Sequence, residues 1–422
     1  MIVVCVPNCI FLSETSRMIA IYESLKELNI KVTMATHGGP YEFVLKKHNI
    51  PYKIIEPKVS RAFYHRYMQS IYDSGRTQNY TIDELRIHVQ GEIDYFRQIE
   101  ASLIVTGFAL TARLSSAACN IPLVVTHLGS WTPITLEKYG VIVSEVFRNL
   151  YTQFIPGNWL NAFGSWLFPR IKSYTKIFNQ VAKEIGLPPF KSLFDLLLGD
   201  HTLITDVPEI LGISEEEVLA WRPDNKNQYR SNIQLAYSGP IFGRLFGEAP
   251  DDVLNFLNTD KPKIYIAMNS GQFQDLKIVY DTVSRLDVMA VMVSTIHDNT
   301  LFRSPNILTV PFLPSHKIMP LCDLAIINGG QGTIQTAIAS GTPIIGFPLQ
   351  PEQNFNLQRV SDLGAGLCMG LFDLRRGNLT YAIKKILEDS VYHQNAGILK
   401  DLQMKRDGPH LTAQYIQKLL ID

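Results

Sequence analysis

The residues Asn328-Gly329-Gly330-Gln331-Gly332-Thr333 form a glycine-rich segment whose residue types suit phosphate binding. Glycines let the backbone approach a ligand closely and adopt positive φ angles. A helical pattern begins near Ile334, so the free N–H groups and the positive dipole end of that helix would face the segment. Loops after strands often contain glycines as well, so the pattern fits both an ordinary loop and a diphosphate site.

A second polar segment follows the helix. A strand ends at Pro348, and the pair Glu352-Gln353 comes shortly after it. Alone, such a pair is typical of a solvated loop. Its nearness to the glycine-rich segment favours a shared site over a solvated loop.

The elements that must position these residues are short strands, rich in β-branched residues, that alternate with helices. In the first half we predict strands at Ile2–Val6, Lys31–Thr36, Tyr52–Ile55, Leu103–Thr106, Leu123–Thr126 and Thr202–Thr205. The pattern restarts after Ser238-Gly239-Pro240, with strands at Ile264–Met268, Ala290–Ser294, Ile307–Val310, Leu324–Ile327 and Ile344–Phe347. This alternation predicts an α/β fold of two Rossmann-like, doubly wound parallel sheets facing a cleft.

The domain boundaries follow from the same pattern. We expect an N-terminal domain over 1–238, a C-terminal domain over 239–405, and a last helix over 406–422 that packs back toward the first domain. Within the first domain, Met18, Ile21, Leu25 and Leu28 recur at helical spacing and predict a helix over about Ser13 to Leu28, with Ser13 as its N-cap.

Residues of about 131–200 interrupt the alternation and contain three of the four tryptophans, with several Lys and Arg nearby. We interpret them as an inserted helical subdomain with its own packed core. The alternatives are an apolar acceptor pocket or a surface that contacts a membrane.

Composition excludes several classes of protein. The chain has 39 basic residues (Lys and Arg) and 39 acidic residues (Asp and Glu), so its formal net charge is zero. A nucleic-acid-binding chain usually has a basic excess. The five cysteines are scattered and predict neither a zinc site nor a disulfide framework. We find no signal-peptide pattern and no apolar run of about 18 residues, so we expect a cytoplasmic protein.

The segment INGGQGTIQTAIASGTPIIGFPLQPEQNFN resembles the donor-binding signature of family 1 glycosyltransferases of the GT-B fold, the group that includes macrolide, sterol, plant and glucuronosyl transferases. The upstream VPFLPSHKIMPLCD resembles the family segment that holds the nucleobase. The resemblance is strongest over roughly 236–370 and is collinear but weaker in the first half.

This resemblance implies the positions of the donor-binding residues. Phe312 would stack on the base and Leu313 would hydrogen-bond it through its backbone. Gly330, Gly332, Thr333 and Ser270 would hold the diphosphate, and Glu352 and Gln353 would bind the transferred sugar.

Two departures from the family pattern concern the donor. The loop histidine of the family is Asn328 here, which brings no positive charge, and the glutamate that usually binds the ribose hydroxyls is Thr336, with Gln335 beside it. A weaker selection for a 2′-hydroxyl makes a dTDP-sugar credible beside a UDP-sugar, unless Gln335 or Thr336 supplies the contact. No Asp-x-Asp sequence stands at the expected diphosphate site, so we expect no metal and no tightly bound cofactor.

Two further departures concern catalysis. Glu14 stands where most family members have a catalytic histidine, and Gly107 stands where they have the aspartate that orients it. We expect Glu14 to be the general base, although a glutamate in a first helical turn also favours the helix dipole. Replacing both residues is self-consistent, because a second carboxylate would raise the pKa of Glu14.

The resemblance predicts an inverting transferase that moves a sugar to a hydroxyl of a hydrophobic small molecule or lipid-like acceptor. The alternatives are a non-catalytic sugar-nucleotide-binding protein and a nucleotide-sugar epimerase. We expect a monomer or homodimer without a nucleic-acid partner, and a peripheral membrane contact is compatible with the aromatic segment. Arg17 could bind an acidic acceptor, and the residues expected to line the acceptor cleft or act as alternative bases are Phe63, Tyr64, Trp131, His37 and His127.

Overall fold

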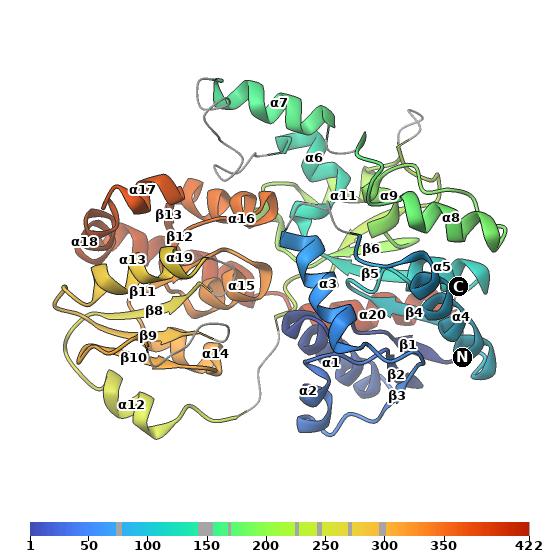
Figure 1. The fold of residues 1–422 in the computed structure, drawn as a ribbon, viewed down its shortest axis with the longest axis horizontal. Helices are drawn as coiled ribbons and strands as arrows, with labels where there is room; N and C mark the ends of the chain where they lie inside the picture. The colour runs from blue at the N-terminus through green and yellow to red at the C-terminus, as the bar shows by residue number, and fades with distance from the viewer. Residues whose placement is uncertain are drawn as a thin grey trace.

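The computed structural model describes residues 1–72, 78–141, 155–167, 170–223, 228–242, 247–268, 272–294 and 301–421. It contains two parallel sheets, each the centre of one α/β domain (Figure 1). The N-terminal domain has the strand order β3-β2-β1-β4-β5-β6-β7, and the C-terminal domain has the order β10-β9-β8-β11-β12-β13. Both orders reverse direction after the first strand of the domain, between β1 and β4 and between β8 and β11. Ligands of doubly wound sheets bind at such switch points, beyond the carboxyl ends of the strands.

The N-terminal domain alternates strands and helices as the sequence predicts. Its strands are β1 (Val3–Cys5), β2 (Val32–Thr36), β3 (Tyr52–Ile54), β4 (Leu103–Thr106), β5 (Leu123–His127), β6 (His201–Ile204) and β7 (Gln234–Tyr237). Its helices are α1 (Leu12–Glu27), α2 (Glu42–Lys47), α3 (Arg61–Tyr72), α4 (Ile82–Gln98), α5 (Ala112–Ala118), α6 (Pro133–Tyr139), α7 (Gly157–Leu167), α8 (Lys176–Glu184), α9 (Leu193–Leu197), α10 (Pro208–Leu211) and α11 (Glu215–Ala220).

The C-terminal domain repeats this order. Its strands are β8 (Lys263–Ala267), β9 (Met289–Val293), β10 (Ile307–Val310), β11 (Leu324–Ile327), β12 (Ile344–Gly346) and β13 (Gly366–Cys368). Its helices are α12 (Asp251–Leu257), α13 (Phe273–Val283), α14 (Ser315–Ile318), α15 (Gln331–Ser340), α16 (Pro351–Asp362), α17 (Leu371–Arg375), α18 (Leu379–Glu388) and α19 (Ser390–Met404).

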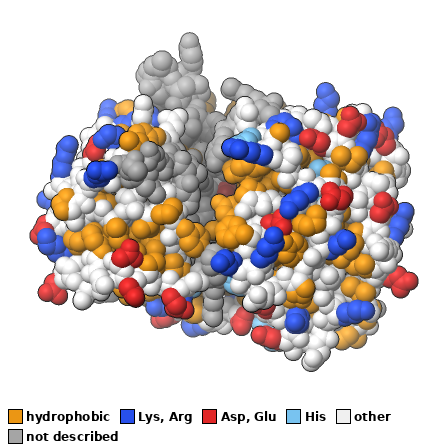
Figure 2. Space-filling view, turned by 60° about the horizontal axis from the view of Figure 1, so that its bottom comes forward, with side chains coloured by type: hydrophobic (Ala, Val, Ile, Leu, Met, Phe, Trp, Pro, Cys, Tyr) orange, Lys and Arg blue, Asp and Glu red, His pale blue; other side chains and the backbone are white. Residues whose placement is uncertain are grey.

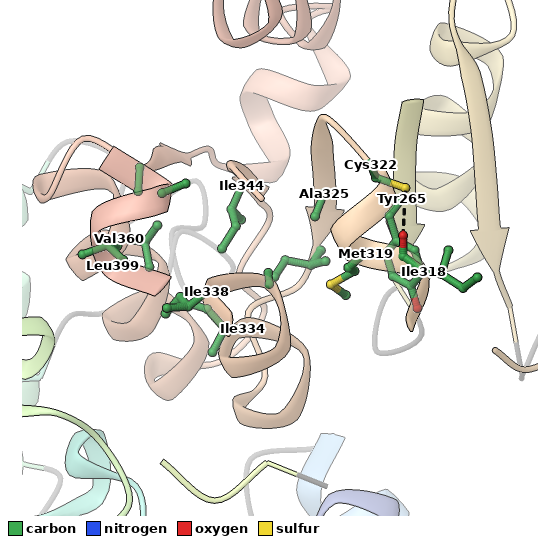
Figure 3. Close-up of a cluster of buried hydrophobic side chains, with 14 of the residues drawn as sticks. Tyr265, Ile318, Met319, Cys322, Ala325, Ile334, Ile338, Ile344, Val360 and Leu399 are labelled. Atoms are coloured by element: carbon green, nitrogen blue, oxygen red, sulfur yellow. Dashed lines mark hydrogen bonds between the residues drawn. The ribbon is translucent and has the colours of Figure 1, made fainter. Parts of the chain in front are cut away.

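Each sheet buries both faces, because alternate residues of its strands point to opposite sides. In the C-terminal domain, Tyr265 of β8 and Ala325 of β11 face a cluster that includes Ile334 and Ile338 of α15, as Figure 3 shows. The intervening residues of β8 and β11 face α13 and α18 on the other side. The glycine-rich segment therefore leads into a helix that is anchored to the sheet by its apolar side.

The chain crosses between the domains twice, and the two crossings touch. The final helix α20 (Gly408–Ile421) packs on α1, with Ala413 and Ile416 buried in the cluster of the N-terminal sheet. Its first residue, Gly408, lies directly against Gly239, where a Cβ on Gly408 would come within 2.6 Å of the Gly239 carbonyl oxygen. Backbones can approach this closely because neither residue carries a side chain.

The structure corrects several details of the sequence prediction. α1 begins at Leu12 and its N-cap is Phe11, without a side-chain cap, so Ser13 is not the N-cap. β7 and β13 were not predicted, because each is short and its sequence shows no extended β-branched run. No described helix is long and apolar enough to cross a membrane.

The described parts of the region 131–200, which are residues 131–141, 155–167 and 170–200, are mainly helical and enclose no core of their own. α8 and α9 pack their apolar residues on the clusters of the N-terminal domain. α7 buries none of its residues, and Trp159, Phe163 and Trp166 are exposed. Within the described residues, the expected separate core is therefore not formed, and the aromatic residues of α7 face outward.

Candidate active site

Glu14 lies at the switch point of the N-terminal sheet. Its carboxylate is buried in the first turn of α1, which follows β1. Glu14 Oε1 accepts hydrogen bonds from the backbone N–H groups of Gly107, at 2.8 Å, and Phe108, at 2.9 Å, in the loop after β4. The structure thus brings together the two positions that the sequence singled out for the acid–base pair.

The backbone at Gly107 lies too close to Glu14 to carry a side chain. A Cβ on Gly107 would lie 2.6 Å from Glu14 Oε1 and 2.7 Å from its Cδ. An aspartate at this position is incompatible with the observed Glu14 conformation. Electrostatics favour replacing both residues together, because a second carboxylate would raise the pKa of Glu14, and the structure adds this steric reason.

Arg17 is the cation nearest to Glu14. Its Nη1 lies 3.7 Å from Glu14 Oε2 and donates to the Thr126 carbonyl at 3.1 Å. Its Nη2 donates to Gln331 Oε1, at the start of α15 in the other domain. Arg17 is buried and its Nε has no hydrogen-bond partner within the part of the chain that the structure describes. A single guanidinium therefore connects the candidate base with the glycine-rich segment.

Three carboxylates share the field of Arg17: Glu14, Asp206 and Glu352. Burial raises the pKa of Glu14, and the attraction of Arg17 and the two backbone N–H groups oppose this rise. Burial also raises the pKa of Asp206, which follows β6 and accepts a hydrogen bond from the Gly129 N–H at 2.7 Å. The pKa of Glu352 rises to about 7, first through burial and further through Asp206. Glu352 can therefore hold or exchange a proton near neutral pH, and the raised pKa values of Glu14 and Asp206 make both carboxylates stronger bases than exposed ones.

The glycine-rich segment lies at the switch point of the C-terminal sheet, between β11 and α15. A Cβ on Gly330 would meet nothing within 4 Å, so the space beside that residue is open. A Cβ on Gly332 would lie 3.3 Å from Ser13 Cβ of α1. The Gln331 N–H donates to the Glu352 carboxylate, so an anionic group already lies at the N-terminus of α15. A ligand phosphate at this segment would therefore lie near the Glu352 carboxyl group, whose pKa is raised to about 7.

Polar side chains of α15 also fasten this segment to the N-terminal domain. Gln331 Nε2 donates to Thr205 Oγ1 at 2.7 Å, and Gln335 Nε2 donates to the Thr205 carbonyl at 2.5 Å. Thr205 follows β6 directly. The carboxyl ends of the two sheets therefore meet across hydrogen bonds in this conformation.

Several predicted donor-binding side chains are engaged within the chain. Asn328 Nδ2 donates to the Phe347 carbonyl at 2.9 Å, and Thr336 Oγ1 donates to the Gly332 carbonyl at 2.6 Å. Gln353 Oε1 accepts the Leu349 N–H at 2.8 Å. Thr333 lies in the first turn of α15, where its N–H donates to the Gly330 carbonyl at 3.1 Å.

The predicted nucleobase site is partly described. Phe312 is half-buried after β10, and the Leu313 side chain belongs to the apolar cluster under α15. Leu313 could therefore meet a base only through its backbone, as the resemblance implies. Ser270 lies outside the described residues.

The predicted acceptor-side residues are dispersed. Phe63 is buried among Tyr67, Tyr80 and His88 and stacks on His88 with ring centroids 5.3 Å apart. Tyr64 is half-buried against the same cluster. His37 has both ring nitrogens engaged, Nδ1 at 3.0 Å from the Ile55 carbonyl and Nε2 at 3.3 Å from Glu92 Oε1. His37 and Phe63 are therefore held by contacts within the N-terminal domain.

His127 ends β5 next to Arg17. Burial and Arg17 lower its pKa to about 3, so the ring is neutral. Its Nδ1 accepts the Leu128 N–H at 3.1 Å, which assigns the proton to Nε2 and makes that atom a donor. His127 is therefore a poorer proton acceptor than Glu14. Trp131 is half-buried against two core clusters, its ring 6.4 Å from that of Phe194.

A small cavity of about 30 Å³ lies between the domains beside this cluster of charges. Asp206 and Gln335 line it together with apolar residues, among them Leu128, Ile334 and Phe355.

Figure 2 shows a face of the molecule on which hydrophobic side chains gather on both halves, with Lys and Arg among them on the half of the N-terminal domain.

Residues 277–419 match the EryCIII-like C-terminal domain family, described as the C-terminal domain of erythromycin biosynthesis protein CIII-like proteins. A "PGL/p-HBAD biosynthesis rhamnosyltransferase" of Mycobacterium bovis (strain BCG / Pasteur 1173P2) is 22% identical over 340 residues, which are 76% of this chain and 68% of the relative. Over most of its length the chain is similar in sequence to named glycosyltransferases, and it is a glycosyltransferase.

Solved structures share the GT-B fold of this glycosyltransferase. The glycosyltransferase VinC in complex with dTDP has 14% identity and a TM-score of 0.66, over 100% of this chain and 98% of VinC. The spinosyn rhamnosyltransferase SpnG complexed with spinosyn aglycone has 18% identity and a TM-score of 0.62, over 99% of this chain and 100% of SpnG. The fold predicted from the sequence is confirmed.

Sequence reasoning did not single out Asp206, Thr205 or Gln331, which the structure places in the candidate site beside Arg17 and the glycine-rich segment. Thr205 and Asp206 stand at the carboxyl end of β6, which was predicted. The rule that sites gather at such strand ends was a usable signal for both.

Proposed function

We propose that this glycosyltransferase moves a sugar from a dTDP-sugar or UDP-sugar to a hydroxyl of a hydrophobic small-molecule or lipid-like acceptor, with inversion at the anomeric carbon. The observation that carries the proposal is the fixed position of Glu14. Its carboxylate is held at one switch point by Gly107 and Phe108, and Arg17 links it to the glycine-rich segment at the other.

The proposed reaction is a direct displacement. The acceptor hydroxyl oxygen attacks the anomeric carbon while its proton passes to Glu14. The bond between the anomeric carbon and the diphosphate oxygen breaks, and the nucleoside diphosphate leaves with its negative charge. The N-terminus of α15 and the amides around Gly330 would stabilise that charge.

Burial suits Glu14 for this role. A raised pKa makes its carboxylate a stronger base than an exposed glutamate, and the two backbone hydrogen bonds to Oε1 leave Oε2 as the proton acceptor. Arg17 would keep the group ionised before the reaction through its positive charge. Arg17 thus acts as a positioning residue, because it holds both Glu14 and Gln331.

The donor class is inferred from Thr336. Its hydroxyl is bonded within α15 to Gly332, and Gln335 donates toward Thr205. Neither side chain is arranged to bind a ribose 2′-hydroxyl, so a deoxyribose donor is favoured. VinC was solved in complex with dTDP, and SpnG was solved in complex with thymidine diphosphate.

Glu352 is proposed to bind hydroxyl groups of the sugar. It is joined to Asn356 Nδ2 at 3.3 Å and to the Gln331 N–H, and its pKa near 7 allows it to accept or donate a hydrogen bond at neutral pH. No described residue needs a metal for any of these steps.

The experiment is the exchange of Glu14→Gln. Nucleotide release from a dTDP-sugar is measured with a panel of phenolic and macrolide-type alcohols, and mass spectrometry identifies the products. We expect turnover to fall by about 10²–10⁴-fold while the affinity for dTDP is kept. An unchanged turnover would refute Glu14 as the base. Product formed without any acceptor would instead indicate an epimerase, and donor binding without any product would indicate a non-catalytic protein.

A further inference from the structure

The helix α7 exposes an unusual amount of aromatic surface. The exposed fractions of Trp159, Phe163 and Trp166 are 69%, 58% and 55%. Soluble chains rarely leave several large aromatic residues together in water. The rings of Phe163 and Trp166 stack at a centroid distance of 6.0 Å, so they form one continuous apolar surface.

These residues share one side of the helix. Trp159, Phe163 and Trp166 are spaced by four and three residues, which places them above one another on an α-helix. Ser165 ties the helix to the rest of the domain through its Oγ, which accepts the Val141 N–H at 2.6 Å. α7 stands apart from both sheets, at the rim above the boundary between the domains (Figure 1).

The charged residues that follow this surface in the sequence have one sign. From Ile155 to Lys183 the sequence contains no Asp or Glu, whereas Arg170, Lys172 and Lys176 follow α7 directly. All three cations are exposed. The Arg170 guanidinium lies 5.0 Å from the centre of the Trp166 ring, so positive charge borders the aromatic side of the helix.

We propose that α7 docks the chain on an anionic lipid surface, with Trp159, Phe163 and Trp166 in the interface and Arg170, Lys172 and Lys176 on the lipid headgroups. Trp is enriched at membrane–water interfaces, and a helix with an aromatic side and flanking cations lies in the plane of the interface. An α-helix of 11 residues is about 16 Å long, about half of the hydrocarbon thickness, so α7 would lie on the bilayer.

Size and charge favour a lipid surface over a protein. The three exposed side chains offer on the order of 400 Å² of apolar area, below the roughly 800 Å² that each partner buries in a stable protein interface. Two copies of this segment would place cations against cations. Because α7 lies at the domain boundary, docking would bring the cleft between the domains next to the lipid surface. The benefit of this placement rests on the proposed lipid-like acceptor, whereas the docking itself does not.

Vesicle flotation of the full chain tests the proposal. Vesicles of phosphatidylcholine alone are compared with vesicles that contain about one third phosphatidylglycerol, at low and high salt. We expect at least tenfold more bound protein on the anionic vesicles, and a decrease at high salt. The triple exchange Trp159→Ala, Phe163→Ala, Trp166→Ala should lower binding at least tenfold.

The matched control is the pair Phe372→Ala, Tyr381→Ala in the C-terminal domain, whose side chains are 59% and 72% exposed. This variant should bind vesicles like the parent chain. The triple variant should keep its thermal midpoint, since α7 buries none of its residues. Equal vesicle binding by the triple variant, or no binding by the parent, would overturn the proposal. Dimerisation that the triple variant abolishes, without vesicle binding, would also overturn it in favour of a second copy.

Discussion

Exchanging Gly107→Ala should displace the candidate base without touching its chemistry. The added methyl group would lie 2.6 Å from Glu14 Oε1 and nearer still to Oε2, whereas an ordinary contact is at least 3.4 Å. The Glu14 carboxylate must therefore move by about 1 Å or more. Gly107 does not lie in the left-handed region, so alanine itself introduces no backbone strain there.

The magnitude follows from the contacts that the movement breaks. Glu14 loses two charge-assisted hydrogen bonds, from Gly107 and Phe108, each worth about 1.5–3 kcal/mol. Since the displaced carboxylate stays near Arg17 and recovers part of this energy, we expect a loss of about 2–3 kcal/mol in the unfolding free energy. A catalytic group misplaced by about 1 Å costs on the order of 10²-fold in turnover.

The assay is a double-mutant cycle with Glu14→Ala. Unfolding free energies are measured by denaturant titration, and turnover is measured on the same samples. In the Glu14→Ala background, Gly107→Ala meets no carboxylate, so its cost should shrink to about 0.5 kcal/mol or less. Equal costs of Gly107→Ala in both backgrounds would refute the steric argument. A fully active Gly107→Ala variant would refute the position of Glu14 as the catalytic geometry.

Two further changes test the charge cluster. Arg17→Met leaves Glu14, Asp206 and Glu352 without their shared cation, so denaturant titration at pH 7.5 should show a loss of about 3–5 kcal/mol, and Arg17→Lys should lose less. Equal stability of Arg17→Met and the parent would contradict the cluster. The pKa of Glu352 in the folded chain is about 7 against an ordinary 4.5, so the folded state binds the extra proton between these values, and its stability contribution falls as the pH rises from 4.5 through 7. Glu352→Gln should remove this pH dependence, which changes the unfolding free energy by at most about 3 kcal/mol over that pH range. A pH titration of stability that gives the same curve for Glu352→Gln and the parent would show that other groups cause the dependence.

The donor preference provides another test. Thermal shifts with dTDP and UDP should favour dTDP in the parent chain, and Thr336→Glu should shift the preference toward UDP by supplying a carboxylate for the ribose hydroxyls. A ligand at 100 times its dissociation constant stabilises by about 2.7 kcal/mol, which is measurable as a change in melting temperature. A parent chain that prefers UDP would contradict the donor inference.

The sequence predicted most strands because buried parallel strands are dense in β-branched residues. Ile344–Gly346 lies within such a run, whereas β13 is Gly-Leu-Cys and offers no pattern to detect. The pairing of Glu14 with Gly107 was predictable through the family resemblance. The link from Arg17 to Gln331 was not, because it joins residues 314 positions apart across two domains, and no local pattern encodes the relative placement of the domains.

The aromatic segment shows a second limit of sequence reading. Trp and Phe at helical spacing predict a buried side equally well whether the partner lies inside the chain or outside it. Only the structure shows that Phe163 faces outward while Phe178, from the next helix, is fully enclosed.

The two chain crossings at Gly239 and Gly408 have a mechanical consequence. Because both crossings pack against each other, the backbone connects the two domains at one place, whereas the other contacts between the domains are noncovalent. Such a joint permits rotation and resists sliding. Opening would therefore part the contacts between Arg17 and Gln331 by an amount that grows with their distance from this joint. A side chain at either glycine would clash with the other crossing and hinder the rotation of the domains. Truncating α20 would remove one of the two backbone connections between them.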